Sequence, residues 1–324
     1  QRGLRVLRAT TRSGLRAMLE LAGSDVAHAD EVTVSYVIAP RLNAAGRLND
    51  ATLGVRLLLT RNSAEADQIA QQLEAINLDR QARTEALWSQ VMERLRQDSD
   101  IARRPAIVLE GEAWEAGVLG PVASRLAHDY DRPAVLIAHT LGGISSASAR
   151  SVVGVDIHAV IASQRQLLVR EGGHPMAAGF AIKREDVAAF TAGLLEAVAA
   201  QAVTRPTTVE LQVDAEVPWS ELGLELARAL GRLRPYGPGN QEPCLVARAA
   251  TMVRSEDVSR KRETNHRRLY LTTDSGEVVR VIWFNAGDLP EAGETVDLAL
   301  RVGRSLLRGE ERLDLMLVRS EEHT

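Results

Sequence analysis

Apolar residues recur at helical spacing from about residue 63 to about residue 97, with Glu and Arg on the other positions. These apolar positions are Ile69, Leu73, Ile76, Leu87, Val91 and Leu95. The pattern predicts one helix of ~35 residues, about 50 Å long at 1.5 Å per residue. Ser63 is the expected N-cap, followed by acidic residues in the first turn. Such a helix is too long for one small core, so we expect residues 61–104 to connect two lobes.

The segment before this helix, residues 1–60, has a mixed pattern. Residues 15–22 follow a helical pattern, whereas residues 32–38 alternate as in a strand. A polar, glycine-containing segment, residues 40–48, comes next. We therefore expect residues 1–60 to contain both helix and strand.

The region after the helix, residues 105–203, contains two uninterrupted apolar runs, 106–109 and 134–137, that predict buried strands. The helical pattern of residues 117–128 lies between them. A strand, a helix and a strand with short joints predict a parallel pair with a right-handed crossover. A helix over 188–201 closes this α/β domain.

The pattern changes again after an expected linker at 204–208. Short alternating strands are predicted at 209–213, 245–253, 268–272, 278–283, 295–302 and 313–318, with one helix at 221–233. This succession in residues 204–324 predicts a small closed barrel, with an oligonucleotide-binding (OB) barrel as the leading candidate.

Composition and charge narrow the classes of function. The chain has 39 basic and 43 acidic residues, a net charge of −4, so any nucleic-acid binding must come from local patches. The one cysteine, Cys244, excludes an internal disulfide framework and a cysteine-based zinc site. No apolar run approaches the ~18 residues of a membrane span, and no signal peptide is evident.

Two glycine-containing motifs carry side chains suited to phosphate. In the first, Gly172 and Gly173 let a ligand approach the backbone, and His174 adds a donor. In the second, Ser148 and Arg150 follow a glycine turn, where a hydroxyl and a guanidinium fork can bind phosphate oxygens. The alternatives are a tight turn with a solvated histidine and a polar edge strand.

Two further segments are rich in arginine. Residues 41–47 include Asn43 and Arg47, which could contact a sugar-phosphate backbone; a helix start with surface arginines is the alternative. Residues 260–268 form an expected loop between barrel strands, where a basic patch would follow phosphates, or else a solvated loop. Its basic residues are Arg260, Lys261, Arg262, Arg267 and Arg268.

The pattern of a metal-dependent or nucleophilic catalytic centre is missing. The seven histidines are scattered, and no pair stands at metal-ligand spacing. Asp129 and Asp131 flank one tyrosine, but they end a predicted helix and are expected in a solvated turn. The sequence therefore shows binding chemistry without a catalytic centre.

Six motifs occur in an order that resembles the RecJ family of single-stranded-DNA exonucleases, in the DHH phosphoesterase superfamily. They are residues 40–47, 73–80, 114–126, 148–151, 172–174 and 235–240. The resemblance implies the end of a DHH catalytic domain (1–60), a long connecting helix (61–104), a DHH-associated α/β domain with the Gly-Gly-His motif (105–203) and an OB domain (204–324).

The resemblance also implies a function: 5′→3′ degradation of single-stranded DNA with Mn²⁺ or Mg²⁺ in recombinational repair. Ser148 and Arg150 would hold phosphate near the 5′ end, Gly173 and His174 would contact the scissile region, and His174 is the one candidate for a catalytic contact. Asn43 and Arg47 would line the channel. The family's metal-binding motifs would precede Gln1, so no metal ligand is expected in this chain, and the chain alone is expected to be inactive.

The partners implied are single-stranded DNA, a single-strand-binding protein and a RecQ-type helicase, in the cytoplasm at the bacterial nucleoid and not at a membrane. Two positions depart from the family pattern: Glu115 stands where histidine is usual, and Glu171 where an aromatic is common. The runner-up hypothesis is a non-catalytic nucleic-acid-binding or scaffold relative. A phosphodiesterase for small nucleotides is a third, against which the barrel argues.

Overall fold

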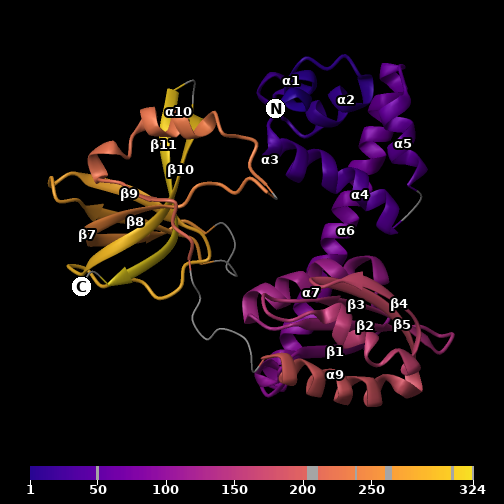
Figure 1. The fold of residues 1–324 in the computed structure, drawn as a ribbon. Coiled ribbons are helices and arrows are strands. Elements are labelled where there is room, and N and C mark those ends of the chain that lie inside the picture. The colour runs from indigo at the N-terminus through magenta and orange to yellow at the C-terminus, as the bar shows by residue number, and fades with distance from the viewer. Residues whose placement is uncertain (49–50, 203–210, 238, 260–264, 308–309, 323–324) are drawn as a thin grey trace. The chain divides into compact units, whose positions relative to one another are not determined.

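The computed structural model describes residues 1–48, 51–202, 211–237, 239–259, 265–307 and 310–322. The chain divides into two compact units, residues 2–209 and residues 210–324 (Figure 1). The expected linker at 204–208 lies outside the described residues.

The first lobe of the larger unit is helical. It contains α1 (Arg2–Arg8), α2 (Ser13–Leu21), α3 (Glu31–Thr33), a π-helical turn (Val34–Ile38), α4 (Ala39–Leu48) and α5 (Thr52–Leu59). The strand predicted at 32–38 is wrong. The Asp30 side chain accepts a hydrogen bond from the Thr33 amide, and the Thr33 hydroxyl accepts one from the Asp30 amide. This capping box starts a helix, which continues through the polar segment 40–48.

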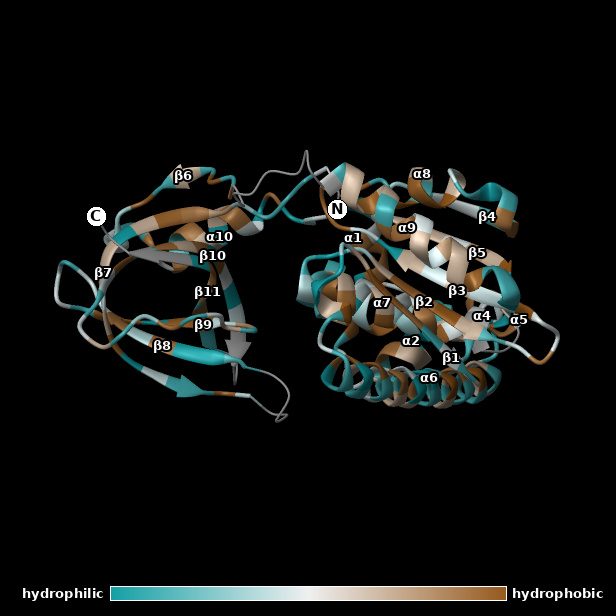
Figure 2. Cartoon of the chain, turned by 90° about the horizontal axis from the view of Figure 1, so that it is seen from below, coloured by the Kyte–Doolittle hydropathy of each residue, from teal (hydrophilic) through white to brown (hydrophobic). Residues whose placement is uncertain are grey.

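The long helix is confirmed as α6 (Ser63–Gln97), with one correction at its start. Asn62, and not Ser63, is the N-cap, because its side-chain oxygen accepts from the Ala64 and Glu65 amides at 2.9 and 3.3 Å. The apolar residues of its first half join the core of the helical lobe, whereas those of its second half join the core of the next domain. Figure 2 shows the alternation of apolar and polar positions along α6.

A five-stranded sheet forms the centre of the next domain. Its strands are β1 (Ile107–Glu112), β2 (Ala134–His139), β3 (Ile144–Arg150), β4 (Leu168–His174) and β5 (Ala177–Lys183), in the order β1-β2-β3-β5-β4. The parallel β1–β2 pair, joined by α7 (Ala116–Tyr130), is confirmed; the other pairs are antiparallel.

Helices cover both faces of this sheet. In Figure 1, α7 lies on one face and α9 (Val187–Ala202) on the other. The short α8 (Ile157–Ala162) packs on β4 and β5. The rings of Phe180 in β5 and Phe190 in α9 lie 4.6 Å apart between their centroids. The sheet face toward α9 is thus apolar at β3 and β5, which leaves the other face of these strands for polar residues.

The second unit is a closed barrel, as predicted. It contains β6 (Ala215–Glu216), α10 (Leu224–Gly231), β7 (Leu245–Asp257), β8 (Arg267–Thr272), β9 (Val278–Trp283), β10 (Thr295–Leu307) and β11 (Glu310–Glu322). The strand order is β10-β11-β9-β8-β7-β6, and pairing of β10 with β7 closes the barrel around an aliphatic core. The described part of the predicted strand 209–213 is not a strand, and α10 is shorter than the predicted helix 221–233.

Candidate nucleic-acid interface

One face of strands β3, β5 and β4 gathers the residues of both predicted phosphate motifs. Arg150 pairs in register with Ala177, which pairs with His174. In the same way, Ser148, Gly179 and Gly172 form the next row. Directly opposite residues of antiparallel strands point to the same face, so the two motifs lie side by side. Two strand spacings separate Arg150 from His174, roughly 10 Å between their backbones.

The Arg150 side chain is held in place from two directions. Its Nη1 donates to Ser148 Oγ at 3.0 Å and to the Ala149 carbonyl at 2.7 Å. A Cβ at Gly120 of α7 would lie 2.6 Å from Arg150 Nη2, so the guanidinium occupies the space that this glycine leaves. The half-buried guanidinium and the Ser148 hydroxyl therefore form one preorganised group, as phosphate binding requires.

The Gly-Gly-His motif is the end of a strand, so the alternative of a tight turn at these residues is wrong. Gly172 and Gly173 belong to β4, an edge strand, and pair with β5. A Cβ at Gly173 would meet the Ala177 carbonyl oxygen at 2.5 Å and the Ala178 Cα at 2.6 Å, so the fold itself requires glycine there. A Cβ at Gly172 would meet nothing within 4 Å. Gly172 pairs in register with Gly179, so this part of the polar face carries no side chains.

Alternation along β4 adds one residue that the sequence analysis missed. Arg170, Gly172 and His174 share a face because side chains of a strand alternate. Arg170 and His174 are exposed, and Arg170 pairs in register with Ala181. The period-2 spacing of 170, 172 and 174 was the available signal, but it has meaning only once the segment is known to be a strand.

The predicted contacts from the helical lobe lie on α4. Asn43 is exposed on this helix, and the backbone of Arg47 belongs to it, but the side chain of Arg47 is outside the described residues. The helix packs on α6, where Arg41 and Glu74 form an ion pair, and it contacts α7. It therefore extends from the helical lobe to the helix that positions Arg150.

Glu115, the first departure from the family pattern, joins α7 to α6. It is the N-cap residue of α7, but its carboxylate forms an ion pair with Arg83 of α6. Arg83 also binds Asp79 at 2.8 Å. Hydrogen bonds to Asp79 and then to Glu115 raise the pKa of the Arg83 guanidinium above its usual range. The carboxylate at position 115 therefore joins helices α7 and α6.

Glu171, the second departure, faces away from the polar face. It lies opposite Phe180, and its carboxylate accepts from Arg165 Nε and His158 Nε2, each at 3.1 Å. The hydrogen bond from Arg165 is the main cause that lowers the pKa of Glu171, and the bond from His158 adds to it. Glu171 thus holds the face of β4 that is opposite to the polar face, and it adds no side chain to the polar face.

The basic loop of the barrel is only partly described. Arg260, Lys261 and Arg262 lie outside the described residues. Arg267 and Arg268 open β8 and are half-buried; Arg267 Nε donates to Asn265 Oδ1 at 2.9 Å, and Arg268 forms a 3.5 Å ion pair with Glu256. The charge of Arg268 is thus partly balanced within the barrel.

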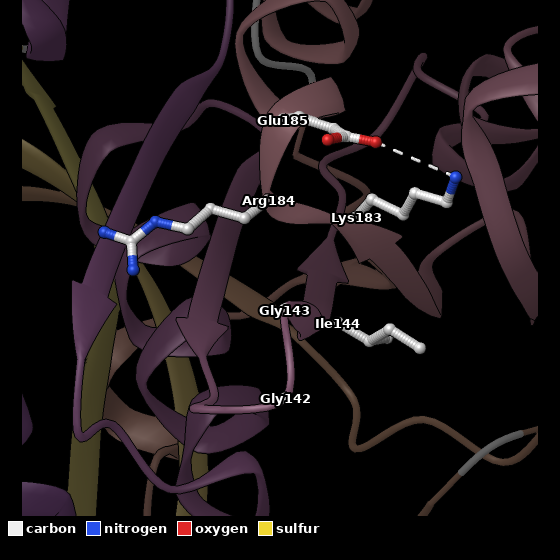
Figure 3. A pocket seen from close by; sticks show the side chains of 6 residues that line it. All are labelled: Gly142, Gly143, Ile144, Lys183, Arg184 and Glu185. Atoms are coloured by element: carbon white, nitrogen blue, oxygen red, sulfur yellow. Dashed lines mark ion pairs between the residues drawn. The ribbon is translucent and has the colours of Figure 1, made fainter.

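A cavity of about 580 Å³ lies at the end of β3 that is opposite to Arg150. It is lined by the Gly142–Gly143 turn and by residues 183–185 (Figure 3). Lys183 Nζ lies 3.7 Å from Glu185 Oε1, and Arg184 forms an ion pair with Glu112. Because both cations already have carboxylate partners, this cavity is poorly suited to an anion.

Among the residues that the structure describes, no three His, Cys, Asp or Glu side chains are placed to hold one metal ion. The described residues thus do not fit a metal centre. No helix in the described ranges is long and apolar enough to cross a membrane.

Comparison with known domains defines the class of protein. The DHHA1 domain family matches residues 104–200, and the RecJ OB domain family matches residues 213–319. A DHHA1 domain followed by this OB domain places the chain among the DHH phosphoesterases. The particular family follows from whole-chain relatives: the chain belongs to the RecJ family.

The relatives are single-stranded-DNA-specific exonucleases named RecJ. The Bacillus subtilis protein is 33% identical over 293 residues, 89% of this chain and 36% of the relative. The Thermus thermophilus protein is 34% identical over 89% of this chain and 39% of the relative. The crystal structure of Thermus thermophilus RecJ in complex with Mn²⁺ has a TM-score of 0.81 and 30% identity, covering 99% of this chain and 46% of that one. The chain thus spans less than half the length of these relatives.

Proposed function

We propose that this chain binds single-stranded DNA and that, in the whole protein, it acts as the substrate clamp of a 5′→3′ single-stranded-DNA exonuclease in recombinational repair. The observation that carries the proposal is the common face of Ser148, Arg150, Gly172 and His174. Membership in the RecJ family supports it.

The chemistry of this face suits a sugar-phosphate backbone. Arg150 and Ser148 supply a fixed fork and a hydroxyl for phosphate oxygens, a pairing that charge-assisted hydrogen bonds favour. Gly172 and Gly179 present no side chain, so a strand can approach the sheet beside Ser148, in the row next to Arg150 and His174. Asn43 and Arg47 on α4 and the basic loop 260–268 of the barrel would contact further phosphates.

The remaining parts of the activity belong to the whole protein. Mn²⁺ or Mg²⁺ would supply activation of water and charge neutralisation there. A single-strand-binding protein and a RecQ-type helicase are the proposed partners, and the cytoplasm at the nucleoid is the proposed location. We expect the 324-residue chain to bind DNA and to release no nucleotides; metal-dependent release by a pure sample would contradict this.

Fluorescence anisotropy with a 5′-phosphorylated, labelled oligodeoxythymidine tests the proposal. Arg150→Ala removes charge-assisted hydrogen bonds worth about 1.5–3 kcal/mol, so we expect a 10- to 150-fold loss of affinity. Arg184→Ala, which removes a cation from the same domain at the other end of the sheet, is the matched control and should change affinity less than threefold. Equal affinities of the wild type and Arg150→Ala would refute the proposed interface.

A further inference from the structure

The barrel presents one aromatic ring to solvent, at the end of β9. Phe284 directly follows this strand and is 57% exposed, and no other aromatic side chain is exposed in the described part of the barrel. A single exposed apolar side chain is ordinary on a protein surface. What distinguishes Phe284 is the way in which it is held and the charge that lies on the same strand.

The backbone around Phe284 is bound to the residues that precede β8. The amides of Asn285 and Ala286 donate to His266 Nδ1 at 3.1 Å and to the Asn265 carbonyl at 2.7 Å. The Asn265 side chain donates in return to the Ala286 carbonyl at 2.7 Å. Asn285 has a left-handed φ of 52°, so the strand ends in a turn at this point. These contacts fix the position of the ring without covering it.

The ring that lies beside Phe284 leaves room for a flat partner. The ring centroids of His266 and Phe284 are 5.2 Å apart, and the two ring planes meet at 78°. Rings at this angle touch edge to face and do not stack. At least one face of the Phe284 ring therefore remains open.

Tyr270, the aromatic residue in the middle of β8, is already engaged within the barrel. It alternates with Leu269 and Leu271 of the core and so lies on the outer surface. The Arg254 guanidinium carbon lies 3.7 Å from the centroid of the Tyr270 ring, and the hydroxyl donates to Glu256 at 2.9 Å. A cation on a ring face competes with any other flat group for that face. A flat ligand therefore meets less competition at Phe284 than at Tyr270.

Arg280 supplies positive charge on the strand that leads to Phe284. It alternates with Val279 and Val281, which join the core, so it lies on the outer surface, and it is exposed. It pairs in register with Tyr270 and forms no ion pair with any residue that the structure describes. Four residues of strand, roughly 13 Å, separate it from Phe284. An open ring and an available guanidinium at this spacing suit a ligand that alternates flat groups with anionic ones.

We propose that Phe284 stacks on a base of single-stranded DNA while Arg280 binds a phosphate of the same strand. This rests on the proposed function and deepens it, because it adds a contact with bases to an interface that otherwise binds phosphates. Every base has a flat face, so the stack tolerates any base sequence. The bases of a duplex are stacked on one another, so Phe284 favours an unpaired strand.

Fluorescence anisotropy of the 324-residue chain with two labelled oligomers of equal length, oligodeoxythymidine and a strand of abasic sites, tests the proposal. Phe284→Ala should weaken binding of oligodeoxythymidine at least fivefold and of the abasic strand less than twofold, because only the first offers bases. Arg280→Ala should weaken both to the same extent. Val278→Ala, at a 56% exposed apolar position at the other end of β9, is the matched control and should change neither more than twofold.

Two conservative variants keep an apolar side chain beside His266. Phe284→Leu removes the flat face and should weaken oligodeoxythymidine at least threefold, with an unchanged melting temperature. Phe284→Trp restores a larger flat face and should bind at least as tightly as the wild type, and the fluorescence of the new indole should fall when the strand binds.

Two results would overturn the proposal: wild-type affinity of the alanine and leucine variants for oligodeoxythymidine, or an equal loss on the abasic strand. Wild-type affinity together with loss of self-association in sedimentation would assign the ring to a protein interface instead. These outcomes leave the proposed function standing. A wild-type chain that binds neither oligomer would overturn both.

Discussion

The guanidinium of Arg150 lies where a side chain of Gly120 would be. A Cβ on Gly120 would stand 2.6 Å from Arg150 Nη2 and 3.4 Å from Ser148 Oγ. A position on α7 thus determines where a cation of β3 can point. The space near Ser148 is available to the guanidinium only because residue 120 has no side chain.

Gly120→Ala should therefore weaken DNA binding with little effect on folding. Of the three atoms nearest to the new methyl group, one lies closer than 3.0 Å, and it is the far end of the Arg150 side chain. Alanine also favours a helix by about 1 kcal/mol over glycine. We expect at least a fivefold loss of oligonucleotide affinity and an unchanged or higher melting temperature. In an Arg150→Ala background, the same change should have no further effect on affinity. An equal loss in both backgrounds would show that Gly120 acts by another route.

The two glycines of the Gly-Gly-His motif should respond differently to alanine. Gly173→Ala places a methyl group against backbone atoms of β5 and should destabilise the fold by about 1–3 kcal/mol, as overpacking does. Gly172→Ala meets open space and should change stability by less than about 0.5 kcal/mol, while it obstructs the strand and weakens DNA binding. Urea unfolding and anisotropy on both variants check this contrast. Equal stabilities would show that β4 and β5 can separate locally.

Stability should depend on pH through Glu171. Arg165, and then His158, lower its pKa in the folded protein below the ordinary 4.5. A carboxyl with a depressed folded pKa contributes stability that is complete above the ordinary value and is lost as the pH falls through the folded value. The stability difference between wild type and Glu171→Gln should hence be constant from pH 7 to about pH 5 and shrink below it. Urea unfolding at each pH measures it, and a difference that grows on acidification would contradict the assignment.

The two faces of α6 allow a matched test of the helical-lobe core. Leu73 is fully buried among residues of α2, α4 and α5, whereas Leu78 is 55% exposed on the same helix. Leu73→Ala should lower the free energy of unfolding by about 2–5 kcal/mol, and Leu78→Ala by less than about 1 kcal/mol. Urea unfolding of both variants provides the measurement. Similar losses would mean that Leu78 is covered in solution.

Local patterns predicted most elements of the fold, and one failure shows their limit. The spacing of Ile69, Leu73 and Leu87 predicts α6 because a helix repeats every 3.6 residues. The alternation at 32–38 resembled a strand equally well, but no strand among the described residues pairs with this segment, and the capping box of Asp30 and Thr33 starts a helix. The capping residues were visible in the sequence; which of the two signals prevails depends on distant packing.

The residue types of the site were also predicted, but their arrangement was not. A glycine turn followed by a hydroxyl and a guanidinium made Ser148 and Arg150 candidate phosphate contacts. That Arg150 lies in register with His174 depends on β5 pairing with both strands, and that Gly120 accommodates the guanidinium depends on α7 crossing β3. Both relationships join residues 20 to 30 positions apart, and no local period encodes them.

The first half of α6 belongs to the core of the helical lobe, and its second half belongs to the core of the next domain. The number of residues between these two halves therefore sets the angle between the lobe and the domain. Each residue of a helix turns the chain by about 100° and advances it by 1.5 Å. One residue inserted between Leu73 and Leu87 would therefore rotate the helical lobe, with α4 and its Asn43, by more than a quarter turn relative to Arg150. The angle between α4 and the sheet therefore depends on the number of residues in α6.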